Sequence, residues 1–379
     1  MPARSQRRCP LLPRQSFNAA RLPAPRAAIG HLRLEFAGAP DEEDHPINDL
    51  SGAAFVGTTL FVAGDEGARI ERLVPTAPGV WGEHRAFDLA ALLGLEGEGE
   101  IDVEGLAYAE DDWLWVTGSH ARTRPKPKRR EGEDGAARID VARMADLKDT
   151  QARCLLARLP LAVGADGRVA PVARDGKRRA GHVKLTKGHG SKLARLFAEH
   201  PLTGPFTRIA AKEGGLDIEG IAVAGGRVAL GLRGPVVADF ALIAEPVIVP
   251  RKRGRLTVGP DLALRLVDLD GMGIRDLKLD GDDLVILAGP TQAIDGRCAV
   301  FRWEGWRHDL PTNATEAAVH RPRHLFDLPV RMGFDRPEAI EWLPGGAGRR
   351  LVVLHDGPCP DRVDPTRCAV TGDVIALAG

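Results

Sequence analysis

The sequence predicts an all-β protein, a β-propeller of five or six blades in which residues 31–379 form a single domain. Two close copies of one pattern, DVEGLA at residues 102–107 and DIEGIA at residues 217–222, indicate an internal repeat. Strand-turn-strand units follow these copies, and the chain has no competing series of amphipathic helices. Repeats of roughly 40–50 residues with several strands each are typical of propeller blades.

The glutamate of the pattern serves as an anchor for finding weaker copies. Five positions fit, and successive anchors are 53, 115, 56 and 63 residues apart. The interval of 115 residues leaves two alternatives open, because it could contain a sixth blade or an insertion. The anchors are Ser51, Glu104, Glu219, Arg275 and Glu338.

Each anchor precedes a predicted β-hairpin. In the second unit, an apolar run at residues 106–108 leads through Asp111 and Asp112 into the strand WLWVTG at residues 113–118. Glycine or aspartate at the turn is the usual signal for a hairpin between two apolar runs. The five hairpins are expected at residues 53–64, 106–118, 221–232, 277–289 and 339–355.

The long interval contains an expected helical and loop insertion at residues 122–215. Within it, residues 154–163 and 167–173 are predicted to form the outer strands of the second blade. GSKLARLFAEHP at residues 190–201 predicts a short helix that Ser191 or Gly190 caps and Pro201 ends. Leu193, Leu196 and Phe197 would form its apolar stripe.

The two ends of the domain are predicted to pair. LRLEF at residues 32–36 and DVIALA at residues 373–378 both have strand character, and their pairing would close the ring and remove an exposed edge. Residues 1–30 contain six arginines and no acidic residue, without the apolar core of a secretory signal. We interpret residues 1–30 as a disordered basic start.

Composition excludes several classes of protein. The chain of 379 residues is 44% hydrophobic and 27% charged, and its formal net charge is +0. This balance argues against binding to nucleic acid or membranes through bulk charge, and no stretch has the about 18 apolar residues of a membrane helix. The five cysteines form no C-x-x-C pair, so a zinc site is not expected and Cys359 and Cys368 are predicted to be reduced. We predict a cytoplasmic protein.

At the level of whole strings, the chain resembles a bacterial family of uncharacterised function. The strings are those at residues 217–236, 273–291 and 49–67, and the resemblance covers roughly residues 32–378. This family shares D-x-E-G-[LI]-A strands with phytase-like and esterase-like propellers, and the resemblance implies the propeller fold without a settled activity. Two copies depart from the pattern, as GIRD at residues 273–276 and RPEA at residues 336–339.

Propeller geometry predicts where a site would lie. The first strand of each blade starts at the face to which the second strand returns, so the anchors and the ends of the second strands should meet at one mouth of the central channel. Asp49 and Asp276 would lie there with the residues to which we assign roles. The predicted catalytic residues are Glu104, Glu219 and His120; the predicted ligand-binding residues are Arg233, Arg275, Asp65, Glu66, His355, Asp356 and Glu338; and the predicted metal ligands are Asp102 and Asp217.

Two functional hypotheses follow. The first is a binder, or a metal-assisted hydrolase of the phosphoesterase or esterase type, that accepts a small anionic or polyhydroxylated ligand and uses a divalent cation such as Ca²⁺. The second is a non-catalytic scaffold for protein partners, in which the glycines allow close packing, the aspartates cap turns and the glutamates form ion pairs. Glu219 separates the two: neutralising it should preserve stability if it serves a ligand, and should reduce stability if it is the partner of Arg233 or Arg275.

A basic stretch follows His120. RTRPKPKRR at residues 122–130 has six basic residues among nine and no aromatic residue that could stack on a base. A solvated loop is the interpretation that we favour, although its start could border the mouth and attract anions. Nucleic acid is not an expected partner, and the sequence does not determine the oligomeric state.

Overall fold

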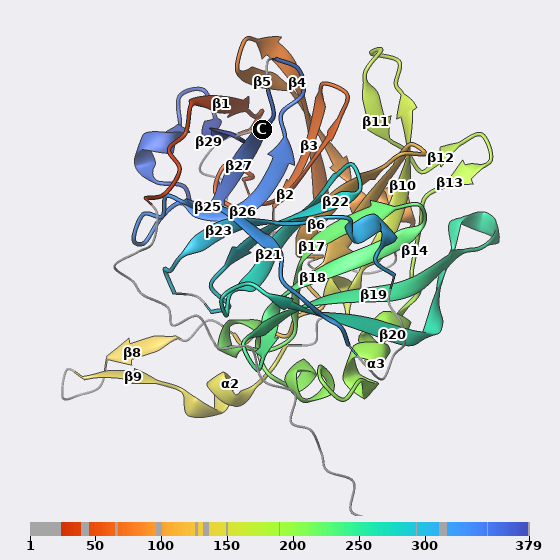
Figure 1. Ribbon diagram of the computed structural model, residues 1–379, viewed down its shortest axis with the longest axis vertical. Helices are drawn as coiled ribbons and strands as arrows, with labels where there is room; N and C mark the ends of the chain where they lie inside the picture. Colours follow the sequence, from red (N-terminus) through yellow and green to blue (C-terminus); the bar gives the residue numbers. More distant parts are fainter. Residues whose placement is uncertain are drawn as a thin grey trace, which may run out of the picture.

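The computed structural model describes residues 24–38, 45–64, 67–95, 101–125, 128–131, 136–148, 151–188, 190–292, 294–310, 317–346 and 348–377. The chain is all-β, as the sequence predicted, and its sheets curl around a common axis in a propeller-like arrangement (Figure 1). No helix in these ranges is long and apolar enough to cross a lipid bilayer.

The long strands form five groups of hydrogen-bonded neighbours. The groups are β2 (Leu50–Val56), β3 (Thr59–Gly64), β4 (Arg69–Ala77) and β5 (Val80–Asp88); β6 (Val103–Ala109), β7 (Trp113–Gly118), β10 (Leu156–Val163) and β11 (Val169–Pro171); β17 (Asp217–Ala224), β18 (Arg227–Val237), β19 (Phe240–Pro250), β20 (Leu256–Asp268) and β24 (Val319–His320); β21 (Gly273–Asp280), β22 (Asp283–Gly289), β23 (Cys298–Trp303) and β25 (Arg323–Leu328); and β26 (Arg336–Trp342), β27 (Arg350–Asp356), β29 (Ala369–Ala376) and β1 (Gly30–Glu35). The five predicted hairpins are all present, as the first two strands of each group.

The first strands of the five groups surround the axis. β2 contacts β6, β6 contacts β17, β17 contacts β21, β21 contacts β26, and β26 contacts β2. The predicted pairing of the chain ends is confirmed, because β1 lies antiparallel to β29 with Leu32 opposite Gly372. β1 also pairs in parallel with β5, so it joins the fifth group to the first. Arg26, which we expected within the disordered start, donates hydrogen bonds to the carbonyl oxygens of Asp327 and Ala376.

Each first strand carries a β-bulge at the same relative position. The ladder to the second strand skips one residue, which a bulge leaves out of the pairing, and the strand bends there. The skipped residues are Ser51, Glu104, Glu219, Arg275 and Glu338, which are the five anchors of the sequence pattern. The pattern therefore coincides with a repeated irregularity of the backbone.

The glycine after the bulge lets neighbouring first strands approach closely. A Cβ atom added to Gly105 would lie 2.9 Å from Cγ2 of Ile221, and one added to Gly220 would lie 2.9 Å from Cγ of Leu277. In β21 the corresponding residue is Asp276, and its Oδ2 accepts a hydrogen bond of 2.9 Å from the backbone N–H of Ile340 in β26. The motif glycines thus serve packing between adjacent groups.

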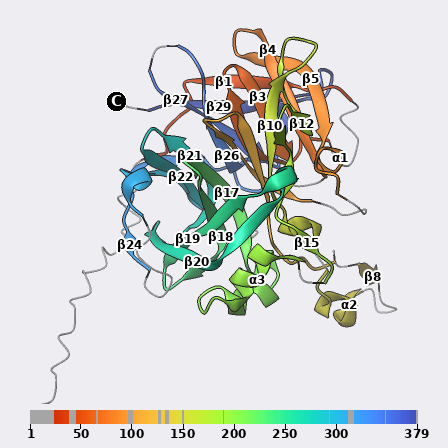
Figure 2. The ribbon, with the colours of Figure 1, turned by 90° about the vertical axis from the view of Figure 1, so that its right-hand side faces the viewer.

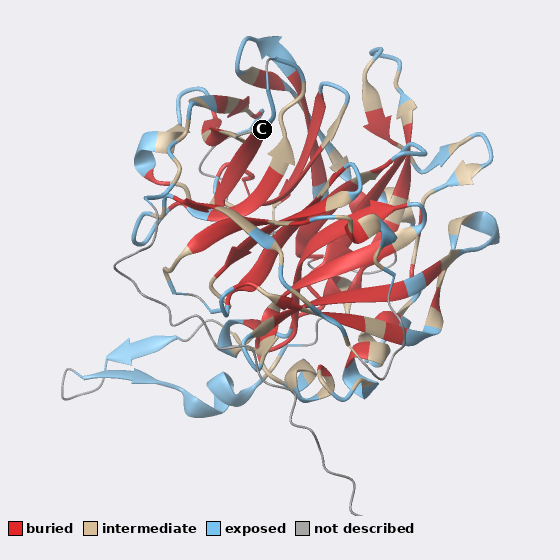
Figure 3. Cartoon of the chain, in the orientation of Figure 1, coloured by how far each residue is buried: buried red, intermediate tan, exposed pale blue. Residues whose placement is uncertain are grey.

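The core is divided among the boundaries between groups. Five clusters of buried apolar side chains are present among the described residues, and each joins two neighbouring groups around the ring. The cluster between the second and third groups also takes in Leu193 and Phe197 of α3 (Lys192–Glu199). Figure 3 shows this burial as a continuous band through the strands.

The predicted insertion contains the outer strands β10 and β11, as expected, and several short elements, of which β8 (Arg129–Glu131), β9 (Ala137–Ile139) and α2 (Val141–Ala145) lie with α3 at one end of the molecule and β12 (Arg174–Asp175) lies toward the other end (Figures 1 and 2). The predicted helix is α3, which Ser191 caps by accepting a 3.1 Å hydrogen bond from the Ala194 N–H. The other short elements are η2 (Ala152–Cys154), β13 (Arg178–Arg179), β14 (Gly181–His182), β15 (Leu185–Thr186), β16 (Gly190–Ser191), η3 (Gly204–Arg208) and η4 (Ala211–Glu213).

Elsewhere the chain has the helix α1 (Leu89–Leu93) and the short elements η5 (Lys252–Gly254), η6 (Trp306–His308), η7 (Pro360–Arg362) and β28 (Val363–Asp364). Residues 122–125, 128–131 and 136–148 belong to an arm, whose outer part β8, β9 and α2 projects from the body with its surface exposed (Figure 3). The basic stretch at residues 122–130 belongs to this arm. Of its described residues, 122 and 128–130 are exposed and 123–125 are half-buried, and Arg129 and Arg130 belong to β8, so the stretch is only in part the solvated loop that we favoured.

Candidate functional site

The structure brings five predicted site residues together in a continuous ion-pair network. Nη1 of Arg233 lies 2.7 Å from Oε1 of Glu219, and another nitrogen of the same guanidinium contacts Asp217. Nε of Arg275 lies 3.0 Å from Oε2 of Glu219, and its Nη2 contacts Glu338. These residues come from β17, β18, β21 and β26, so the network connects three groups of strands at the axis.

A second ion pair extends this network toward the second group. Oδ2 of Asp102 accepts a 2.6 Å hydrogen bond from the Ser119 hydroxyl and lies 2.7 Å from Nη1 of Arg153. We call Asp102, Arg153, Asp217, Glu219, Arg233, Arg275 and Glu338 the central ion cluster. Burial alone would lower the pKa of Arg233, but Asp217, Glu219 and Glu104 raise it above its ordinary value. Glu104 therefore lies close enough to act on the cluster.

Burial removes the carboxylates of the central ion cluster from water, and this desolvation disfavours their charged form. Burial raises the pKa of Asp217 to about 7; Arg233 opposes this rise, whereas Glu219 and Asp102 add to it. Asp276 lies apart, where its Oδ1 is 3.1 Å from Nζ of Lys278, and burial raises its pKa to about 6. Both arginines that we expected to receive a ligand are thus engaged by carboxylates.

The other predicted residues lie outside the cluster. Nε2 of His355 is 3.3 Å from Oδ2 of Asp373, and Asp356 is paired with Arg336 at 3.1 Å. Within the described ranges, neither His355 nor Asp356 forms an ion pair with a member of the cluster. Asp65 and Glu66 lie outside the described residues.

The predicted metal ligands, Asp102 and Asp217, are poorly placed to bind a divalent cation. Asp102 and Asp217 each contact a guanidinium group, and a cation there would have to displace it. Among the described residues, no group of three or more His, Cys, Asp or Glu side chains is arranged to hold a metal ion. The described residues at the mouth therefore do not fit the divalent cation, and the function proposed below does not depend on one.

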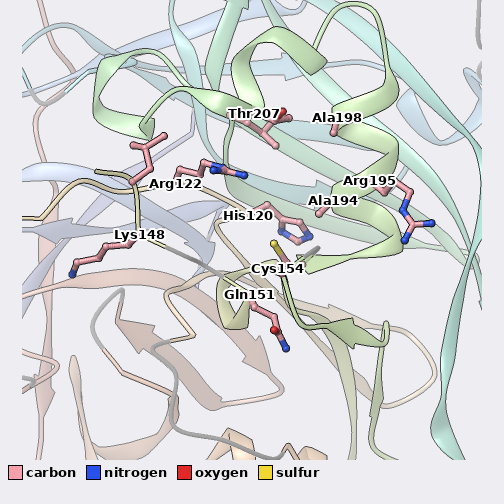
Figure 4. A pocket seen from close by; sticks show the side chains of 13 residues that line it. His120, Arg122, Lys148, Gln151, Cys154, Ala194, Arg195, Ala198 and Thr207 are labelled. Atoms are coloured by element: carbon pink, nitrogen blue, oxygen red, sulfur yellow. The ribbon is translucent and has the colours of Figure 1, made fainter. Parts of the chain in front are cut away.

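A pocket of about 410 Å³ lies beside the cluster, and we call it the lateral pocket. We call residues 122–125 and 146–148, at the two ends of the arm, its stalks. The pocket is enclosed by these two stalks together with η2, α3 and η3 (Figure 4). The lateral pocket and the central ion cluster are neighbours along the chain. At three places, one residue belongs to or contacts the cluster and the residue next to it in sequence lines the pocket. In these pairs Ser119, Arg153 and Asp217 belong to or contact the cluster, whereas His120, Cys154 and Leu216 line the pocket.

The lateral pocket is positively charged. Arg122 and Lys148 line it from the two stalks of the arm, and Arg195 lines it from α3. In Figure 4 the Arg122 guanidinium points toward the centre, whereas the Lys148 ammonium and the Arg195 guanidinium lie at opposite edges. All three side chains are exposed, and no acidic side chain is among the described residues that line the pocket. Such a group of cations favours an anionic ligand, because arginine donates paired hydrogen bonds to carboxylate or phosphate and lysine adds a compact charge.

His120 is the buried polar residue of this wall. It has a φ of 55°, its backbone N–H donates to the Arg153 carbonyl at 3.0 Å, and its Nδ1 lies 3.1 Å from the Gly118 carbonyl oxygen. Nε2 has no hydrogen-bond partner among the described residues. Burial lowers the pKa of His120 to about 4, although the contact with Gly118 opposes this shift. The imidazole is therefore neutral at pH 7.

Sequence reasoning identified His120 but missed most of the lateral pocket. Ser119 donates to Asp102, whereas the neighbouring His120 lines the lateral pocket, so the two side chains diverge. Arg122 was included only as the start of the basic stretch, which could border the mouth, whereas in the structure Arg122 lines the lateral pocket. Lys148, Gln151, Arg195 and Thr207 carry no periodic signal, and Arg153 gave no sign that it would pair with Asp102.

Comparison with known proteins identifies a family without an activity. The model of a family described as "Protein of unknown function (DUF3616)" matches residues 49–373. No curated protein matches the chain.

Among solved structures, the chain is similar to an α-L-arabinofuranosidase from Podospora anserina (9% identity, 94% of this chain and 98% of that chain covered, TM-score 0.39). It is also similar to regucalcin, a calcium-binding protein from Agrobacterium tumefaciens (13%, 91% and 96%, TM-score 0.34), and to the allergen Mala s 1 of Malassezia sympodialis (11%, 91% and 81%, TM-score 0.37). These scores are too low to carry an argument about this chain.

Proposed function

We propose that this chain, which belongs to the DUF3616 family of proteins of unknown function, binds a small organic anion in the lateral pocket. The observation that carries the proposal is that Arg122, Lys148 and Arg195 all line a pocket without a described acidic side chain. A volume of about 410 Å³ falls within the range of about 300–1,000 Å³ that is usual for small-molecule sites. The proposal assigns binding and no reaction.

The lateral pocket supports this function better than the predicted mouth does. Arg233 and Arg275 are already neutralised by Asp217, Glu219 and Glu338, so an anion there would have to compete with buried carboxylates. Arg122, Lys148 and Arg195 form no ion pair with any described residue. Within the described part of the chain, their charge is therefore not offset by an ion pair.

The scaffold hypothesis receives support from one part of the molecule. It requires that the charges at the mouth satisfy one another and that no pocket remains, and the paired arginines meet the first condition. The outer arm supports it too, since Val141 is 80% exposed there. The lateral pocket does not meet the second condition, and for this reason we place anion binding first.

We also infer five blades rather than six. The support is that five first strands surround the axis and that the interval between the second and third anchors supplies β10 and β11 to the second group. Residues 122–215 then hold an insertion and outer strands, and their described part contains no complete blade.

Isothermal titration calorimetry on the full chain tests the proposed function. The probes are inorganic phosphate, propyl phosphate and hexanoate, each at two salt concentrations. We expect at least one of them to bind, with an affinity that falls as salt rises because exposed cations are screened. Arg195→Gln should weaken that affinity about tenfold, since a hydrogen bond to a charged group contributes roughly 1.5–3 kcal/mol.

The matched control is Arg168→Gln. Arg168 is a partly exposed arginine that pairs with Glu83 at 3.1 Å and does not line the lateral pocket. It should leave the affinity unchanged. The proposal fails if none of the three probes and neither gluconate nor glycerol 3-phosphate binds, or if Arg195→Gln and Arg168→Gln have equal effects on the affinity.

A further inference from the structure

The polar groups of the lateral pocket differ between its opening and its inner wall. Arg122, Lys148 and Arg195 are exposed, and their side chains can only donate hydrogen bonds. His120 is 6% exposed and Thr207 is half-buried, so both lie deeper. Hydrogen-bond donors thus surround the opening of the lateral pocket, whereas His120 and Thr207 are polar side chains on its inner wall.

His120 presents an acceptor. The Gly118 carbonyl oxygen, 3.1 Å from Nδ1, can only accept, so Nδ1 must carry the hydrogen of the neutral ring. Nε2 then holds a lone pair, and it is buried without a hydrogen-bond partner in the described part of the chain. A buried polar atom without a partner is costly, and a ligand that donates to it would remove that cost. Figure 4 shows the imidazole on the same wall as the Cys154 thiol.

Thr207 presents a second acceptor. Its hydroxyl group donates to the Gly204 carbonyl oxygen at 2.8 Å, which uses the only hydrogen that the hydroxyl has. The oxygen of Thr207 can therefore only accept from a molecule in the pocket. Two acceptors from different parts of the chain, the segment after β7 and the helix η3, thus accompany the cations of the opening.

We propose that the ligand of the lateral pocket is a hydroxylated anion, whose acidic group contacts the cations at the opening and whose hydroxyl groups donate to His120 Nε2 and Thr207 Oγ1. This inference rests on the proposed function and specifies its ligand class. Hydroxy carboxylates and phosphate esters of polyols share this chemistry. An anion with an alkyl chain would leave the buried nitrogen unpaired.

Two matched pairs of probes separate the two sources of this chemistry. Gluconate and hexanoate are six-carbon carboxylates with and without hydroxyl groups, and glycerol 3-phosphate and propyl phosphate form the corresponding phosphate pair. Calorimetric titration of the full chain should show that the hydroxylated member of at least one pair binds about threefold to tenfold more tightly. That range is the factor expected from one or two hydrogen bonds at roughly 0.5–1.5 kcal/mol each.

Two variants assign the preference to the inner wall. His120→Asn suits the left-handed backbone, can keep a donor toward Gly118 and removes Nε2. It should abolish the preference for the hydroxylated member and leave the affinity for its alkyl counterpart within about twofold. Thr207→Val, which has nearly the same shape, should reduce the preference in part. Arg195→Gln should weaken both members of a pair by the same factor.

The outcomes distinguish this inference from the proposed function. If the alkyl anions bind as tightly as the hydroxylated ones, or if both wall variants retain the preference, the inference is wrong and anion binding stands. If none of the four probes binds, the inference is wrong, and if inorganic phosphate does not bind either, both are wrong. A preference that disappears in His120→Asn and persists in Arg195→Gln supports both.

Discussion

Oε2 of Glu219 lies 3.0 Å from Nε of Arg275, while Oε1 of the same carboxylate lies 2.7 Å from Nη1 of Arg233. One glutamate therefore partly neutralises two guanidinium groups that have little access to solvent. Glu219 is also the skipped residue of the bulge in β17, so the backbone itself directs it out of the strand ladder. This arrangement favours a structural role for Glu219 over the catalytic role that we assigned to it from the sequence.

Glu219→Gln should strongly destabilise the protein. The change leaves Arg233 and Arg275 with less negative charge than their burial requires, and breaking a buried ion pair costs on the order of 3–5 kcal/mol. Urea unfolding measures the loss. Glu213→Gln is the control, because Glu213 pairs with Arg124 at the exposed surface and such pairs contribute little. Unchanged or increased stability in Glu219→Gln would restore the functional interpretation.

Gly220→Ala should destabilise the protein by about 1–3 kcal/mol through overpacking. The new Cβ would lie 2.9 Å from Cγ and 3.0 Å from the backbone nitrogen of Leu277, and the backbone cannot move as a flexible side chain can. Gly30→Ala is the control within a strand, because no described atom lies within 4 Å of the place that its new methyl group would take. Equal unfolding midpoints for the two variants would show that close approach of β17 and β21 does not require glycine.

The strands and hairpins were predictable because they depend on local signals. Alternating apolar runs, Gly or Asp at turns and the recurrence of the anchors are all visible in the sequence, and they predicted the pairing of each first and second strand. The bulge at each anchor also explains why the pattern persists where its residue types change, as at Arg275: the position is fixed by the backbone, and its charge follows from the partners around it.

The candidate site was less predictable because it depends on contacts between distant segments. Asp102 was expected to bind a ligand or metal, but Arg153 reaches it from 51 residues away. The lateral pocket combines His120, Lys148 and Arg195 from a strand end, a stalk of the arm and a helix. No spacing in the sequence links these three residues. Only the folded insertion brings them together.

The stability of the protein should depend on pH through His120. Its pKa is lowered from 6.5 to about 4 by burial, so the unfolded chain binds a proton there at a higher pH than the folded chain does. The stabilising contribution of the neutral imidazole is complete above pH 6.5 and is lost as pH falls from 6.5 to 4. The shift corresponds to about 3 kcal/mol.

Urea unfolding from pH 7.5 to pH 4 measures this dependence. His120→Asn should remove most of it, so that its stability relative to the parent protein improves as the pH falls. His308→Asn, at an exposed histidine, is the control and should keep the parent slope. If His120→Asn follows the parent protein at every pH, then His120 is not held neutral by the fold.

Arg124 should determine how firmly the arm is attached. Its Nη1 donates to the carbonyl oxygens of Met144 and Ala145 at 2.6 and 3.1 Å, and its Nε lies 2.5 Å from Glu213 of η4. The Lys148 N–H also donates to the Thr123 carbonyl at 2.9 Å. Arg124→Ala removes the side-chain contacts and keeps the Lys148–Thr123 hydrogen bond between the stalks, so the outer arm should open more often and trypsin should cleave it several-fold faster.

Limited trypsin digestion followed by mass spectrometry identifies which arginines of the arm are cut. The thermal midpoint of Arg124→Ala should remain that of the parent protein, because the described residues of the outer arm belong to no core cluster. Arg168→Ala, an exposed ion-pair deletion outside the arm, should leave the cleavage rate unchanged. If Arg124→Ala is cleaved no faster than Arg168→Ala, then Arg124 does not restrain the arm.

An anion that binds both Arg122 and Lys148 should slow the cleavage, because it bridges the two stalks at the point where they meet the lateral pocket.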